Sequence, residues 1–132
     1  MCEKLLSPSI LQKSLLHSNE YGWRREDVQE VIEDAVRAQL AILGGQPQFI
    51  TPKGIFELYW VNYDSSPRRE NENWIVYVHR TAREVTQEFQ TRVRETNFLE
   101  EARKLPLFQN YSDIELENYL WFLLVFQADS GS

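Results

Sequence analysis

The stretch FELYWVNYDSSPRRENENWIVYVHR, residues 56–80, decides which fold the sequence predicts. Aromatic and β-branched residues at both of its ends are typical of strands, and its polar middle is typical of a loop. We therefore predict a β-hairpin with strands over 55–63 and 74–80. Because side chains alternate along a strand, both faces of this hairpin would carry large apolar side chains. An antiparallel sheet with one solvated face shows a polar face instead.

Three explanations account for the second apolar face of the predicted hairpin. Helices of the same chain cover it, or it lines a small-molecule pocket, or it forms an interface with another protein. Aromatic residues beside a pair of arginines favour the interface, because both types anchor protein contacts. We expect some of the aromatic side chains to be accessible next to the arginine loop. The candidate binding residues are Tyr59, Trp60, Tyr63, Arg68, Arg69, Trp74 and Tyr77.

Helical periodicity is found on both sides of the hairpin. Apolar residues recur at steps of three and four, which predicts helices with one buried face. Capping boxes mark two helix starts, Thr81 with Glu84 and Ser112 with Glu115. The predicted helices span 8–17, 24–43, 81–104 and 113–127, the third with a break near 96–97.

Two stretches with glycine or proline mark chain reversals. Gly44-Gly45 predicts the end of the second helix, because glycine takes the left-handed cap conformation without a steric cost. The tetrapeptide TPKG, residues 51–54, predicts a turn between a short strand at 49–50 and the first strand of the hairpin. The resulting element order is α-α-β-β-β-α-α.

Size and composition indicate one folded domain. The chain has 132 residues, of which 42% are hydrophobic and 13% aromatic, and this is enough for a core. The predicted fold class is α+β, a single domain over 1–132 with a small antiparallel sheet packed by helices. We expect the ends of the chain, 1–6 and 128–132, to be flexible.

The longest apolar run, YLWFLLVF at 119–126, has no polar residue on any side. A helix with a single buried face is polar over the rest of its surface, so this segment is predicted to be buried nearly all round. It lies either at the centre of the domain or under a partner, and a second copy of the chain is the simplest partner. The run is far shorter than the roughly 20 residues that a membrane-spanning helix needs, so we expect no membrane.

The acidic balance of the chain bears on its partners. A net charge of −6 argues against a protein that binds phosphate backbones, and it suits a basic protein partner. Cys2 is the only cysteine, and the amino-terminal segment lacks the apolar core of a signal peptide. We therefore expect a cytoplasmic protein that binds no nucleic acid.

Catalytic and metal-binding patterns are missing from the sequence. The histidines, His17 and His79, have no partner residues at zinc-ligand spacing. As a general base, His79 would need an orienting partner and a substrate cleft, and neither can be identified. We therefore assign no catalytic residue, no metal ligand and no cofactor, and we favour a protein that is not an enzyme.

Three functions remain open. The first is a non-enzymatic protein-binding protein of the immunity, inhibitor or chaperone type, which uses the aromatic sheet surface or an acidic helix face. The second is a small-molecule-binding or enzymatic domain with a pocket between the sheet and the last helix. The third is RNA binding, because the element order over 24–104 resembles that of double-stranded-RNA-binding domains. Those domains carry a lysine cluster at the start of the second helix, where this chain reads TAREVTQEF.

Overall fold

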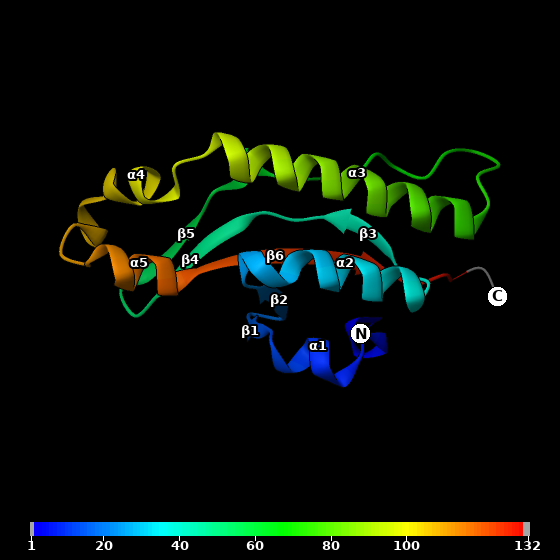
Figure 1. Cartoon of the computed structure of the whole chain (residues 1–132), viewed down its shortest axis with the longest axis horizontal. Coiled ribbons are helices and arrows are strands. Elements are labelled where there is room, and N and C mark those ends of the chain that lie inside the picture. The colour runs from blue at the N-terminus through cyan, green and yellow to red at the C-terminus, as the bar shows by residue number, and fades with distance from the viewer. Residues whose placement is uncertain (1, 131–132) are drawn as a thin grey trace.

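A single antiparallel sheet organises the chain, which a computed structural model describes from residue 2 to residue 130 (Figure 1). The central strand is the last one, and it pairs with β2 on one side and with β4 and β3 on the other. Among the described residues the strand order is β1-β2-β6-β4-β5, and β3 pairs with β6 next to β4. The strands are β1 (Leu15–His17), β2 (Glu20–Trp23), β3 (Ala41–Gly44), β4 (Pro47–Thr51), β5 (Gly54–Glu57) and β6 (Leu120–Gln127).

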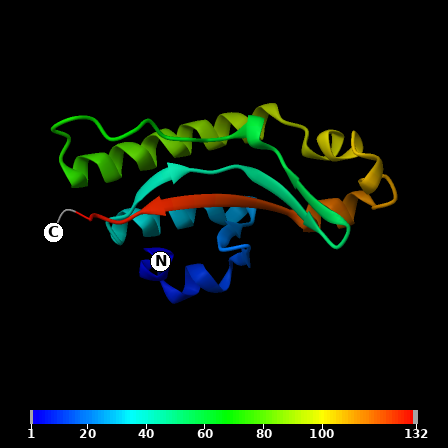
Figure 2. The ribbon, with the colours of Figure 1, turned by 180° about the vertical axis from the view of Figure 1, so that it is seen from behind.

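Helices cover one face of this sheet. In Figure 1 α2 lies in front of β6 and α3 runs along the upper side of the strands, and in Figure 2, seen from behind, β6 lies in front of α2. The predicted α+β class with an antiparallel sheet is therefore confirmed. The α-helices are α1 (Pro8–Gln12), α2 (Val28–Arg37), α3 (Trp74–Glu95), α4 (Phe98–Arg103) and α5 (Asp113–Tyr119). The 3-10 helices are η1 (Cys2–Leu5), η2 (Arg25–Asp27), η3 (Tyr59–Val61) and η4 (Pro106–Phe108).

The predicted third strand, 74–80, is instead the beginning of the long helix α3. Asn73 caps this helix, since its side-chain oxygen accepts a hydrogen bond from the backbone N–H of Ile75 (2.9 Å). The residues that α3 buries recur at helical steps, although their aromatic and β-branched composition is typical of a strand. They are Trp74, Tyr77, Val78, Arg80, Thr81, Ala82 and Val85.

Thr81 lies inside α3, so the capping box predicted for Thr81 and Glu84 is wrong. The Thr81 hydroxyl donates to the carbonyl of Val78 (2.9 Å) and accepts from the backbone N–H of Ile42 on β3 (3.0 Å). Thr81 is fully buried, and these two bonds satisfy its hydroxyl. The side chain therefore fixes α3 on the sheet.

The strand β6 replaces the second half of the helix predicted over 113–127. The side chains of Phe122 and Leu124 point into the core under the helices, and Leu123 points to the opposite face, where it is also buried. The face of β6 that lies in the core needs no polar residue, which explains half of the apolar run, whereas on the opposite face Val125 is 40% exposed. An apolar run of this length fits a buried strand as well as a buried helix, so periodicity alone could not separate the two.

The second predicted helix ends earlier than expected. α2 ends at Arg37, and Gln39 takes a left-handed backbone conformation (φ 58°) before β3 begins. Gly44-Gly45 is therefore no helix end but an irregularity between β3 and β4, where the pairing register with β6 shifts. Gly45 passes so close to the carbonyl oxygen of Leu123 that a Cβ atom at this position would clash with it.

Three local predictions are confirmed. α3 stops at Glu95 and α4 starts at Phe98, which is the break expected near 96–97. Both bonds of the last capping box are present, because Ser112 Oγ accepts from the N–H of Glu115 (3.1 Å) and the Glu115 carboxylate accepts from the N–H of Ser112 (2.9 Å). The TPKG tetrapeptide forms the turn between β4 and β5.

The amino-terminal segment differs from its prediction in length. α1 ends at Gln12, and residues 15–17, which were assigned to the same helix, form β1. Within the end that was predicted to be flexible, residues 2–5 form η1, and Leu6 is buried. Positions 1, 131 and 132 lie outside the described residues.

Candidate protein-binding surface

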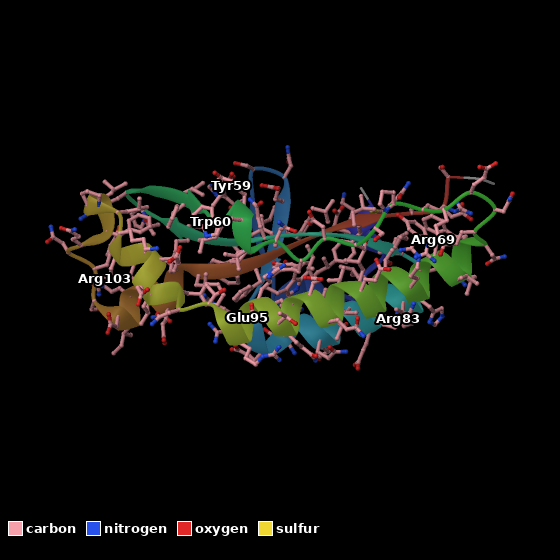
Figure 3. The ribbon with its side chains drawn as sticks, turned by 90° about the horizontal axis from the view of Figure 1, so that it is seen from above. Tyr59, Trp60, Arg69, Arg83, Glu95 and Arg103 are labelled. Atoms are coloured by element: carbon pink, nitrogen blue, oxygen red, sulfur yellow. The ribbon has the colours of Figure 1, made fainter. Side chains whose placement is uncertain are left out.

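The predicted binding residues do not form one surface. Trp74 and Tyr77 lie in the first turns of α3, whereas Tyr59 and Trp60 lie on η3 beside its last turns. Figure 3 accordingly shows Tyr59 and Trp60 well separated from Arg69. We call Trp74 and Tyr77 the sealed end, and Tyr59 and Trp60 the open end.

Burial separates the two ends. Tyr59 is 68% exposed and Trp60 is 47% exposed, whereas Trp74 is 8% exposed and Tyr77 is 2% exposed. Two of the predicted aromatics are therefore accessible, but they do not lie next to the loop with Arg68 and Arg69, where accessible aromatics were expected. Of the remaining candidates, Tyr63 is buried, and Arg68 and Arg69 are exposed in the loop that leads to α3.

Arginine side chains lie against both rings of the sealed end. The guanidinium carbon of Arg68 lies 5.2 Å from the ring centre of Trp74 and 5.9 Å from that of Tyr77. Tyr77 also faces the guanidinium of Arg80 at 5.3 Å. The indole N–H of Trp74 donates to the carbonyl of Gln39 (2.9 Å). Because a cation is attracted to an aromatic face, these groups satisfy one another within the chain.

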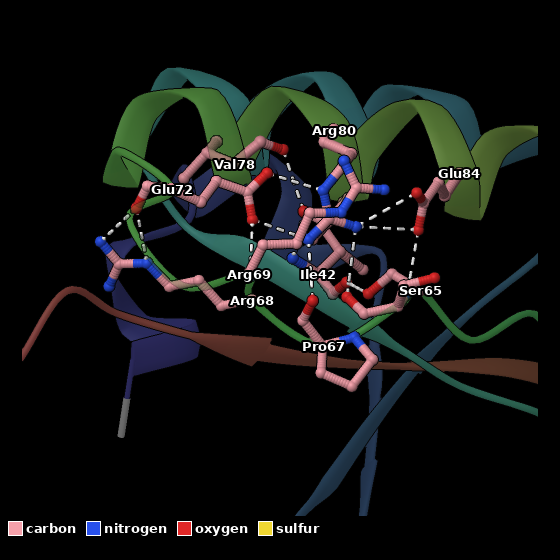
Figure 4. Close-up of polar contacts among 11 residues, drawn as sticks. Ile42, Ser65, Pro67, Arg68, Arg69, Glu72, Val78, Arg80 and Glu84 are labelled. Atoms are coloured by element: carbon pink, nitrogen blue, oxygen red, sulfur yellow. Dashed lines mark hydrogen bonds and ion pairs between the residues drawn. The ribbon is translucent and has the colours of Figure 1, made fainter.

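Arg80 fastens the loop between η3 and α3 to the helix (Figure 4). Its side chain is 4% exposed and donates to both oxygens of Glu72 (2.7 and 2.9 Å) and to Glu84 (3.1 Å). It also donates to the carbonyls of Ser66 and Pro67 (3.3 and 3.0 Å). The hydrogen bonds from Arg80 lower the pKa of Glu72 from 4.5 to about 2. This network holds the chain together and leaves no place for an outside anion at Arg80.

The open end arises because η3 interrupts the edge strand. The segment leaves the sheet after Leu58 and returns at Tyr63, and the N–H groups of these two residues donate to carbonyls of Pro47 and Gly45 (3.0 and 3.2 Å). Leu58 and Val61 are buried at the two sides of the turn, so the two residues between them project outward. The strand predicted over 55–63 is therefore correct only in its first part.

Aromatic neighbours support Trp60. Its ring centre lies 5.7 Å from that of Phe56 and 5.1 Å from that of Tyr59. Phe56 in turn contacts the buried ring of Phe108 at 6.3 Å. Tilted and edge-to-face contacts at such distances are favourable, so the exposed indole is held in a defined orientation. A side chain that is already ordered loses little entropy when it binds.

A groove beside Trp60 adds charge to the open end. It encloses about 360 Å³ between η3, the last turn of α3 and the first turn of α4. We call it the Trp60 groove. The charged residues that line it are Arg92, Glu95, Glu100 and Glu101.

The charges of the Trp60 groove are only partly compensated. Arg92 pairs with Glu88 (3.3 Å) and donates to the carbonyl of Asn62 (3.2 Å), which ties the returning chain to α3. Glu101 pairs with Lys104 (2.7 Å). The other two carboxylates of the groove form no ion pair in the described part of the chain. The groove therefore presents an excess of negative charge next to an exposed indole.

A second hollow lies on the sheet face that the helices leave open. It encloses about 410 Å³ over Leu123 and Val125, with Glu20 and Asp64 on its sides. The Asp64 carboxylate accepts the N–H of Gly45 (3.2 Å), so it supports the irregular backbone there. The second function left open by the sequence requires a pocket between the sheet and the last helix. Most of the residues expected in that helix are instead the strand that floors this hollow.

A metal site requires several ligating side chains that lie close together. Residues 2–130 contain no cluster of three His, Cys, Asp or Glu side chains that could hold a metal ion. His17 lies on β1 and His79 on the exposed side of α3, and neither lines one of the two hollows. Over the same described residues, the helices are all too short or too polar to cross a membrane.

No family model, curated protein or solved structure matches this chain. The functional interpretation therefore rests on the geometry of the open end. Glu95 and Glu100 belong to this geometry but were not among the predicted binding residues. Their one sequence signal is the helix break at 96–97, and only the folded chain brings that break next to Trp60.

Proposed function

We propose that this chain is a non-enzymatic protein-binding protein whose contact surface is the open end together with the Trp60 groove. The observation that carries the proposal is the solvent exposure of two adjacent aromatic side chains. Within residues 2–130, Tyr59 and Trp60 are the aromatic side chains that remain exposed, and they are adjacent. Large aromatic side chains on an ordered support are typical anchors of protein interfaces.

The shape of the open end supports a protein partner over a small molecule. A small-molecule site encloses most of its ligand in a concave and mainly apolar pocket. The Trp60 groove instead has an aromatic residue at one side and carboxylates at the other, and Tyr59 projects outside it. An extended protein surface can contact both parts at once, with an apolar centre and a polar rim.

Site-specific cross-linking tests the proposal. A photoreactive phenylalanine analogue at position 59 should capture one defined partner in the cells that make the protein. The matched control is position 114 on α5, where Ile114 is 74% exposed, and it should not capture the same partner. The captured protein can then be purified, and its affinity for this chain can be measured by calorimetry.

The affinity of substituted variants for the purified partner decides whether the proposal holds. Trp60→Ala should raise Kd at least about tenfold, which corresponds to about 1.4 kcal/mol of binding free energy. Ile114→Ala should leave Kd unchanged. A folded Trp60→Ala variant with the Kd of the wild type would contradict the proposal.

Self-association, a cytoplasmic location and the lack of nucleic-acid binding stay predictions. The apolar run that suggested a homo-oligomer lies in the central strand β6, whose core face is buried and whose opposite face exposes Val125. If a second copy is the partner at the open end, light scattering should show a dimer that Trp60→Ala dissociates. If the protein is a monomer at all concentrations, the prediction of self-association is wrong, and the partner is a different protein.

A further inference from the structure

The Trp60 groove offers two kinds of contact to a single partner group. Trp60 lines one part of the groove, and the carboxylates of Glu95 and Glu100, which are free of ion pairs in the described chain, line another. An aromatic face attracts a cation that lies within about 6 Å of its centre. A carboxylate accepts strong, charge-assisted hydrogen bonds from the same cation.

The sealed end shows the same recognition inside the chain. There Arg80 lies beside the ring of Tyr77 (5.3 Å) and is bonded to the carboxylates of Glu72 and Glu84 (2.7 and 3.1 Å). An arginine between an aromatic ring and two carboxylates is thus an arrangement that this fold already stabilises. At the other end of α3, Trp60 and the groove carboxylates present the same kinds of group to the outside.

We infer that the Trp60 groove takes a lysine or arginine side chain from a basic segment of the partner protein, an inference that rests on the proposed function. The groove carries more carboxylates than guanidinium groups, and the whole chain has a net charge of −6. Arg92 opposes an incoming cation little, because Glu88 pairs with it. An acidic segment would meet the carboxylates of Glu95 and Glu100 and would be repelled.

Peptide titration followed by NMR tests the inference without knowledge of the partner. The probe is acetyl-Gly-Arg-Gly-Arg-Gly-amide, and the comparison peptides carry glutamate or glutamine in place of arginine. The indole N–H signal of Trp60 is assigned with Trp60→Phe. The arginine peptide should shift this signal and the amide signals of 95–101 in a saturable way, with a Kd in the range of about 1 mM. The other two peptides should not shift them.

Paired variants separate the groove from general attraction to an acidic protein. Glu95→Gln/Glu100→Gln should weaken binding of the arginine peptide roughly fivefold. Glu33→Gln/Glu70→Gln removes the same charge from exposed positions on α2 and in the loop before α3, and it should leave the affinity unchanged. Equal losses in both variants, equal binding of the glutamate peptide, or an unshifted Trp60 signal would each overturn the inference.

The results also separate this inference from the proposal on which it rests. If Trp60→Ala weakens binding of the purified partner but the arginine peptide does not bind in the groove, the open end binds protein by apolar contacts. The inference of a basic partner segment is then wrong. If Trp60→Ala leaves the partner's Kd unchanged, the proposed function itself fails, whatever the peptide does.

Discussion

The sealed end and the open end, which lie at opposite ends of α3, contain the same kinds of side chain and use them differently. At the sealed end, Arg68 and Arg80 face the rings of Trp74 and Tyr77, and the rings are buried. At the open end, Tyr59 and Trp60 are exposed. The comparison shows that aromatic residues next to arginines in a sequence do not by themselves indicate an interface. They do so only where these side chains do not already contact one another within the folded chain.

The largest expected difference between the ends is in stability. Trp74→Ala removes a buried indole and should lower the free energy of unfolding by about 3 kcal/mol. Trp60→Ala removes an indole that is 47% exposed and should cost about 1 kcal/mol or less. Urea unfolding of the two variants measures both values. Equal losses would mean that the open end is part of the core.

The Arg80 network should give the next largest effect. Arg80→Met leaves the carboxylates of Glu72 and Glu84 without their partner and should cost about 2 kcal/mol of unfolding free energy. The control is Arg92→Met, because Arg92 is 39% exposed and its pair with Glu88 should contribute less than about 0.5 kcal/mol. If Arg92→Met lowered the free energy of unfolding more than Arg80→Met, the assignment of the Arg80 end of α3 as the sealed end would be wrong.

The pH dependence of stability should show the contribution of Glu72. Its pKa in the folded protein is about 2 instead of 4.5, so the folded state favours the ionised carboxylate. The stabilisation is therefore fully present above pH 4.5 and is lost as the pH falls toward about 2. Unfolding free energies of Glu72→Gln should fall less over this range than those of the wild type. Glu70→Gln, at an exposed neighbouring position, should follow the wild-type curve.

The smallest expected effect is the stability change from the groove carboxylates. Glu95→Gln/Glu100→Gln should change the free energy of unfolding by less than about 0.5 kcal/mol, because both residues are exposed and form no ion pair in the described chain. Thermal unfolding checks this value. A large loss would show that these residues are needed for the fold, and any loss of binding in this variant would then have a trivial cause.

Local signals with a single structural meaning could be predicted from the sequence. Ser112 with Glu115 caps a helix in the structure, and the TPKG turn joins two strands, because both motifs act through bonds among neighbouring residues. The same capping pattern at Thr81 and Glu84 was misleading, because these residues lie inside α3. The α+β class followed from the predicted element order and is correct, although one of the strands in that order is helical in the structure. Apolar segments whose composition fits both strand and helix could not be assigned in this way.

The segment 74–80 and the run 119–126 show this limit in opposite directions. Segment 74–80 has the composition of a strand and is helical, with a buried stripe at Trp74, Tyr77 and Val78 that continues through α3. The run 119–126 was predicted to be helical and is mainly the central strand β6. In both cases the partner surface decides the structure, and that surface comes from distant parts of the chain. The Trp60 groove was missed for the same reason, because α3 and α4 meet η3 only in the folded protein.

The most direct test of this account is hydroxyl-radical footprinting of the free protein, read by mass spectrometry at the aromatic residues of both ends. Tyr59 and Trp60 should be oxidised rapidly, and Trp74 and Tyr77 should be protected until the protein unfolds. Oxidation of Trp74 at the rate of Trp60 in the folded protein would contradict the account, because it would mean that the end assigned as sealed is also open to a partner.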